Sequence, residues 1–237
     1  MMDSEQRHQL WRFVRGDADT HEFEQWLYHH GGLENALGEA LYLDLVSCHF
    51  SDKAEVARLR KALQSKLHID EKCECHGIPD LASIPMGGEE YVEGVFYFEK
   101  VFESLGEILS YGPEKWWLTL YTCNQCQQVW MVAQEERIYD EFLLKRIDRT
   151  EAQKAAQGEW PSTFWTYEKT LTTARKFREA PQFFDPMAYS LQWTVEDLLK
   201  ERPEITESEI ANLLGLSASD CSKLVQKVRR SGADSLL

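Results

Sequence analysis

Residues 121–130 read YTCNQCQQVW and place Cys123 and Cys126 in a short turn between two runs of aromatic and β-branched residues. The flanking runs, 116–121 and 129–132, are typical of two strands joined in a hairpin. A turn of this kind presents backbone N–H groups to the cysteine sulfurs. The stretch therefore predicts a zinc-knuckle β-hairpin.

A second pair of cysteines, Cys73 and Cys75, precedes the hairpin, with 47 residues between the two pairs. Two short clusters that each offer two thiolates suit a tetrahedral zinc ion, which would join segments far apart in the sequence. The C-x-C spacing of the first pair is less usual, and His76 is a possible substitute ligand. A redox dithiol and unrelated buried thiols are the alternatives to structural zinc. Four protein ligands leave no position for water, so we do not expect a catalytic zinc.

Composition bounds the class of protein. The chain has 237 residues, of which 43% are hydrophobic and 28% are charged, a balance typical of folded globular domains. The N-terminus lacks a basic stretch followed by an apolar run, and no segment approaches twenty uninterrupted apolar residues. We therefore expect a soluble, cytoplasmic protein without membrane contact, whose cysteines stay reduced. Cys48 and Cys221 are expected to be small core residues.

The formal net charge of −14 disfavours sequence-independent binding to nucleic acid, because such binding needs lysine and arginine to displace counterions from the phosphates. Eight acidic residues and one lysine lie between Asp80 and Glu114. A solvated surface is the simplest interpretation, and a patch that attracts a basic partner is the alternative. The glutamates predicted to form such a partner-binding patch are Glu89, Glu90, Glu93, Glu99 and Glu103.

Hydrophobic periodicity predicts helices throughout residues 5–70. Gly16 ends the first helix, Asp19 or Thr20 caps the second, residues 33–48 form a third, and Ser51 or Asp52 opens a fourth. The aromatic stripe of Trp11, Phe13, Trp26 and Tyr28 is expected to lie in the core, and a binding face is the alternative.

The fold class predicted from these patterns is α+β and mostly helical. We expect a helical module at 1–70, a zinc-binding α+β module at 71–180 and a helix-turn-helix-like module at 187–237. Trp160-Pro161-Ser162 is expected to open a helix that continues to about Phe177.

No sequence motif of catalysis is present: the chain lacks G-x-S-x-G, a P-loop, G-x-G-x-x-G and H-E-x-x-H. The acidic residues between Glu135 and Glu141 alternate with basic ones and suggest a charged surface. We therefore expect that the protein is not an enzyme.

The C-terminal segment contains Thr206-Glu207-Ser208-Glu209, a capping box, followed by Gly215 and a second cap at Ser217. This pattern resembles the helix-turn-helix of bacterial regulators. A protein-docking or purely structural three-helix module is the alternative. If the segment binds DNA, the residues expected to contact it are Ser217, Ser219, Ser222, Lys223, Gln226, Lys227, Arg229 and Arg230.

The first 65 residues contain LWRFVRGD at 10–17, FEQWLY at 23–28, Leu33-Glu34, Leu37-Gly38 and LYLDL at 41–45. This segment resembles the helical part of small bacterial proteins that accompany toxin genes as immunity factors. The resemblance implies a toxin-neutralising role. An acidic protein suits a basic toxin through complementary potential.

We therefore expect a non-catalytic, zinc-stabilised immunity protein that neutralises a basic bacterial toxin. The alternative is a zinc-containing helix-turn-helix transcriptional regulator that binds DNA through its C-terminal helices.

Overall fold

The computed structural model describes residues 2–30, 32–68, 72–87 and 94–234 of the chain. These residues form two compact units, Met1–Asp80 and Leu81–Leu237. The described parts contain eleven α-helices and one five-stranded antiparallel sheet, so the predicted α+β class is confirmed. The boundaries of the three predicted modules stay a prediction.

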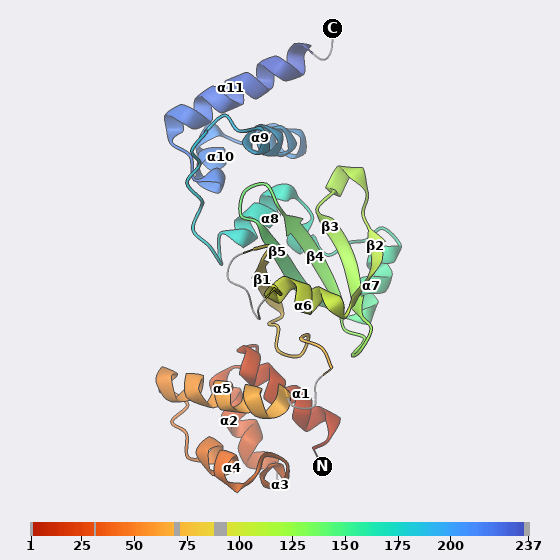
Figure 1. The fold of residues 1–237 in the computed structure, drawn as a ribbon, viewed down its shortest axis with the longest axis vertical. Coiled ribbons are helices and arrows are strands. Elements are labelled where there is room, and N and C mark those ends of the chain that lie inside the picture. The colour runs from red at the N-terminus through yellow and green to blue at the C-terminus, as the bar shows by residue number, and fades with distance from the viewer. Residues whose placement is uncertain (1, 31, 69–71, 88–93, 235–237) are drawn as a thin grey trace. The chain divides into compact units, whose positions relative to one another are not determined.

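The first unit consists of α1 (Ser4–Arg15), α2 (Thr20–His29), α3 (Leu33–Leu37), α4 (Glu39–Val46) and α5 (Lys53–His68) (Figure 1). Sequence signals set the ends of these helices. Gly16 ends α1 in the left-handed conformation, with φ of 81°. The Asp19 side chain caps α2, and the Asp52 carboxylate accepts hydrogen bonds from the first turn of α5.

The core of the first unit is built from the apolar faces of its helices. Trp11 and Phe13 are buried, as the sequence predicts, and the Phe13 ring stacks on Phe23 with centroids 3.9 Å apart. Tyr28 departs from the expectation for the aromatic stripe, because its side chain is 58% exposed. The expected single helix at 33–48 is also wrong. Gly38, with φ of 89° and ψ of 150°, ends α3 and separates it from α4.

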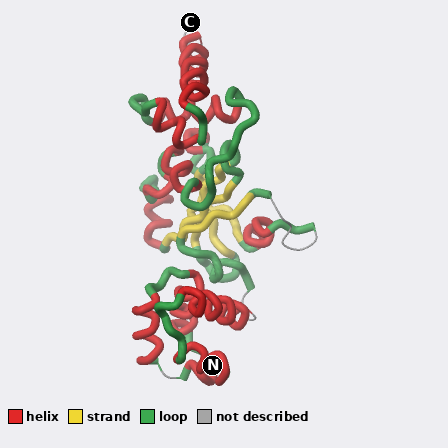
Figure 2. The backbone as a smooth tube through the Cα atoms, turned by 90° about the vertical axis from the view of Figure 1, so that its left-hand side faces the viewer, coloured by secondary structure: helices red, strands yellow, loops and turns green. Residues whose placement is uncertain are grey.

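The second unit is organised around strands β1 (Leu81–Pro85), β2 (Leu105–Ser110), β3 (Leu118–Cys123), β4 (Val129–Glu135) and β5 (Glu141–Ile147), in the order β1-β5-β4-β3-β2. The predicted hairpin around the C-x-x-C is therefore confirmed as β3–β4. A bulge interrupts the pairing of β2 with β3 between Glu107 and Leu109. Figure 2 shows helices on both sides of this sheet.

Short helices complete the sheet unit: α6 (Tyr97–Glu103), α7 (Arg149–Ala156), α8 (Tyr167–Ala174) and the 3-10 helices η1 (Pro113–Lys115) and η2 (Ser162–Phe164). Aromatic rings hold α6 to one face of the sheet, where the ring centroids of Phe102 and Phe142 are 4.7 Å apart. The expected continuous helix at 160–177 is instead η2 followed by α8, because Thr166 is extended and caps α8 with its side chain.

The C-terminal helices are α9 (Tyr189–Glu201), α10 (Glu207–Leu214) and α11 (Ala218–Asp234). Their apolar residues join the sheet face that packs on α8 in one continuous core, which includes Met131, Leu171, Val195 and Leu224. The predicted capping box of Thr206 and Glu209 is present, and Gly215 ends α10 in the left-handed conformation. The C-terminal helices thus share their core with the sheet.

Candidate metal centre

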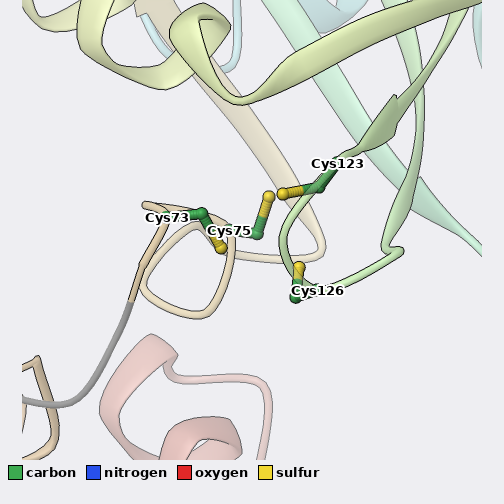
Figure 3. A group of neighbouring side chains, drawn as sticks. All are labelled: Cys73, Cys75, Cys123 and Cys126. Atoms are coloured by element: carbon green, nitrogen blue, oxygen red, sulfur yellow. The ribbon is translucent and has the colours of Figure 1, made fainter.

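The four predicted cysteine ligands come together. The sulfurs of Cys73, Cys75, Cys123 and Cys126 all lie within 4.8 Å of one another, and all six cysteines of the chain are free thiols (Figure 3). A tetrahedron with Zn–S bonds of about 2.3 Å places its sulfurs about 3.8 Å apart. Small side-chain movements therefore bring these sulfurs to the spacing that a metal ion requires. The donor set fits a soft or borderline metal ion.

The turn between β3 and β4 positions the second pair. The Cys123 carbonyl accepts a hydrogen bond from the Gln127 N–H, and the Cys123 N–H donates to the Gln128 carbonyl. Gln127 adopts φ of 61°, a conformation that glycine tolerates best. The Gln125 N–H points at the Cys123 sulfur, 3.4 Å away. A backbone donor of this kind stabilises a thiolate, as the zinc-knuckle prediction requires.

The first pair follows α5 and is anchored to α1. Arg15 donates to the carbonyl of His76 at 2.9 Å and pairs with Asp17 at 2.5 Å. Asp17 in turn accepts a hydrogen bond from the N–H of Asp80. Arg15 and Asp17 thereby fix both ends of the loop that follows Cys75. Sequence reasoning missed this role, because the partners are about sixty residues apart.

His76 is not a member of the four-cysteine group. Its ring lies beside Trp11, with centroids 6.1 Å apart. Its role as a substitute ligand stays a prediction. Cys221 is buried in the core, as expected, and Cys48 is partly buried.

Two acidic residues expected at a charged surface are buried instead, so that interpretation is wrong for Glu135 and Glu141, which are 0% and 1% exposed. The Glu135 carboxylate accepts hydrogen bonds from the N–H groups of Ile138 and Tyr139 and from the Tyr167 hydroxyl, at 2.6 Å. Burial raises the pKa of Glu135, although these bonds oppose the shift. The backbone N–H groups close the β4–β5 turn around this carboxylate, and the Tyr167 hydroxyl ties the turn to α8, which gives Glu135 a structural role.

A cavity of about 460 Å³ lies between η1 and the C-terminal half of α9. Two ion pairs lie at or beside the cavity: Lys115 lies 3.3 Å from Glu201 and 4.5 Å from the Trp165 ring centroid, and Arg137 lies 2.8 Å from Asp197. The residues that line the cavity are Pro113, Glu114, Lys115, Trp116, Trp117, Asp197, Lys200 and Glu201.

The predicted acidic patch is only partly described. Glu89, Glu90 and Glu93 lie outside the described residues. Glu99 and Glu103 are on α6 and exposed, and the Glu99 carboxylate accepts a hydrogen bond from the Phe96 N–H at 2.8 Å. Glu99 thus also serves as a cap of its own helix.

The predicted DNA-contacting residues follow the turn after α10. The Ser217 hydroxyl accepts a hydrogen bond from the Asp220 N–H and so caps α11. The opposite face of α11 packs into the core through Cys221, Leu224 and Val225. Ser222 is half-buried, and the exposed candidates are Ser217, Ser219, Lys223, Gln226, Lys227, Arg229 and Arg230.

The fold and the site define an α+β protein with a cluster of four cysteines able to hold a metal ion. Comparison with family models, with curated proteins and with solved structures found no match to this chain. Among the described residues, no helix has the length and apolar character needed to cross a membrane.

Proposed function

We propose that this chain is a non-catalytic binding protein that is stabilised by one zinc ion and neutralises a basic protein toxin. The observation that carries the proposal is the group of four cysteine sulfurs within 4.8 Å of one another. Four thiolates are the ligand set of structural zinc sites, which hold loops in place and leave no position for a reacting water.

The acidic character of the chain supports a basic partner. The net charge of −14 gives a potential that speeds the association of a positively charged protein and disfavours nucleic acid. The resemblance of the first 65 residues to immunity factors agrees with this partner. The four-cysteine group then serves as a support for recognition.

Metal analysis of the untagged protein tests the first half of the proposal. We expect one equivalent of zinc per chain. The paired substitution Cys123→Ser with Cys126→Ser should remove the zinc and cost about 3 kcal/mol or more of folding free energy, which corresponds to a melting temperature lower by roughly 10 °C. Cys48→Ser is the matched control, since Cys48 is outside the group. Zinc-free wild-type protein, or unchanged melting of the paired variant, would reject the role of the metal.

Capture of the native partner from the host tests the second half. We expect a basic protein whose toxicity the purified chain suppresses, with association that slows steeply as salt is raised. An acidic partner, or a partner bound equally well at all salt concentrations, is incompatible with the proposal.

One observation favours a second candidate, binding of duplex DNA. The exposed face of α11 carries Lys223, Lys227, Arg229 and Arg230, and the helix follows a short turn after the capped helix α10. A helix with this placement fits the major groove, with basic residues on the phosphates.

A gel-shift titration at low salt separates the two candidates. Lys223→Glu with Lys227→Glu should abolish the retention of duplex DNA if α11 contacts it. Lys61→Glu with Lys66→Glu is the matched control, because it changes the net charge equally on the exposed face of α5. Failure of the wild type to retain DNA would argue against a DNA-binding α11. Equal weakening of retention by the two pairs of substitutions would argue against it as well.

A further inference from the structure

Residues 16–52 contain eight acidic residues and no lysine or arginine. This stretch runs from the end of α1 to the start of α5 and includes α2, α3 and α4. Glu22, Glu34 and Glu39 are exposed, and no described basic residue pairs with them. The surface formed by these helices is therefore strongly negative. The acidic residues of the stretch are Asp17, which is largely buried and paired with Arg15, and Asp19, Glu22, Glu24, Glu34, Glu39, Asp44 and Asp52.

Two large apolar side chains are exposed in the same stretch. Tyr28, on α2, is 58% exposed, and Leu43, on α4, is 52% exposed. The Tyr28 hydroxyl donates to the carbonyl of Val46 at 3.3 Å, which places the end of α2 against the end of α4. Tyrosine is among the residues that contribute most to binding energy in protein interfaces. The exposed side chains of Tyr28 and Leu43, on two helices whose ends meet, are therefore suited to anchor a partner.

Carboxylates from two parts of this unit act on the thiol of Cys48, which follows α4. Burial raises the pKa of the Cys48 thiol, and the charges of Glu55, Asp52 and Glu24 raise it further, opposed by Arg58. Glu24 belongs to α2, whereas Asp52 and Glu55 lie at the start of α5.

The basic groups that pair with these carboxylates are Arg58 and two histidines. Arg58, on α5, lies 3.7 Å from Asp44, with both side chains more than half exposed. The two histidine pairs, His21 with Glu24 and His49 with Glu55, are 3.6 and 3.5 Å apart. An exposed arginine pair of this kind contributes little and exchanges readily for a partner's basic group.

We propose that the exposed face of α2 and α4 is the surface that binds the basic protein partner, with Tyr28 and Leu43 as apolar anchors and Glu24 and Asp44 as complementary charges. This inference rests on the proposed function and locates its interface. The fitting partner offers lysine or arginine side chains around an apolar hollow that accepts the two anchors. Phosphate-bearing partners are repelled by the same carboxylates.

Fluorescence anisotropy with the full-length protein tests the surface. The probe is a labelled amphipathic peptide of arginine and leucine, and the control peptide has citrulline, the uncharged analogue, in place of arginine. We expect the arginine peptide to bind with affinity that falls as salt rises, and the citrulline peptide to bind at least about tenfold more weakly.

Two paired variants separate the contributions of charge and apolar contact. Glu24→Lys with Asp44→Lys should weaken binding at least about tenfold and flatten its salt dependence. Tyr28→Ala with Leu43→Ala should weaken binding by a similar factor and leave the salt dependence unchanged. Glu159→Lys with Glu204→Lys, at exposed positions outside the predicted acidic patch, changes the net charge equally and should have little effect.

Equal weakening by the Glu159 and Glu204 pair would overturn the inference, because binding would then follow net charge alone. Equal affinity for the arginine and citrulline peptides would overturn it as well. Neither result bears on zinc content or on capture of a basic toxin, so this inference can fail while the proposed function stands.

Discussion

Removal of the Tyr167 hydroxyl should destabilise the protein in a pH-dependent way. The hydroxyl donates to the buried Glu135 carboxylate at 2.6 Å. A hydrogen bond to a charged group contributes about 2 kcal/mol, so Tyr167→Phe should lower the melting temperature by roughly 4–8 °C at pH 7.5. The phenyl ring keeps the contact with Trp117, whose ring centroid is 5.0 Å away.

The sign of the pH dependence follows from the raised pKa of Glu135. In the native protein the Glu135 carboxyl keeps its proton at pH values where the same carboxyl in the unfolded chain has released it. The contribution of Glu135 to the free energy of unfolding therefore falls as pH rises from about 4.5 through its native pKa. Tyr167→Phe removes a bond that lowers the native pKa. The variant should therefore lose more stability at pH 7.5 than at pH 4.5.

Tyr139→Phe is the matched control. The Tyr139 hydroxyl donates to the uncharged carbonyl of Leu213 at 2.9 Å, and burial raises the pKa of Tyr139 to about 12. Its loss should cost about 1 kcal/mol equally at both pH values. Urea unfolding of the two variants at pH 4.5 and 7.5 provides the measurement. A Tyr167→Phe effect that is the same at both pH values would refute the coupling of the Tyr167 hydroxyl to the protonation of Glu135.

Three further substitutions test local geometry. Gly215→Ala should cost about 3 kcal/mol in urea unfolding, because φ is 68° and the added Cβ would lie 2.4 Å from the Ala180 Cβ. Gln127→Gly should raise the melting temperature of the zinc-loaded protein slightly, since φ is 61°; a lower value would contradict strain at that turn. Thr206→Ala should cost about 1 kcal/mol by removing the cap of α10, with the exposed Ser208→Ala as a neutral control.

Local signals were sufficient to predict several elements. The caps at Asp19, Thr206 and Ser217 depend on residues within three positions of each other, and the helices begin where these signals predict. The four cysteines were predictable because two-ligand clusters are a local pattern, even though the clusters lie far apart in the sequence.

Features that depend on distant residues were not predictable. The buried Glu135, at the end of β4, accepts a hydrogen bond from the Tyr167 hydroxyl of α8, 32 residues away in the sequence. Arg15 and Asp17 hold the Cys75 loop through contacts across about sixty residues. The sequence shows a glycine at position 38 but does not predict that a helix ends there, because an isolated glycine also occurs within helices. The absence of lysine and arginine from residues 16–52 can be read from the sequence, whereas the exposure of Tyr28 is seen only in the fold.

The bulge in β2 has a consequence for how the protein behaves in a crowded cell. An outermost strand with regular backbone spacing is a template for pairing with another chain, and such pairing leads to fibrils. In β2 the extra residue, Ile108, disturbs that spacing beside the acidic Glu107, and β1 at the opposite border ends in Pro85, which has no N–H to offer. Both borders of the sheet are thus poor templates for the addition of a strand from another chain.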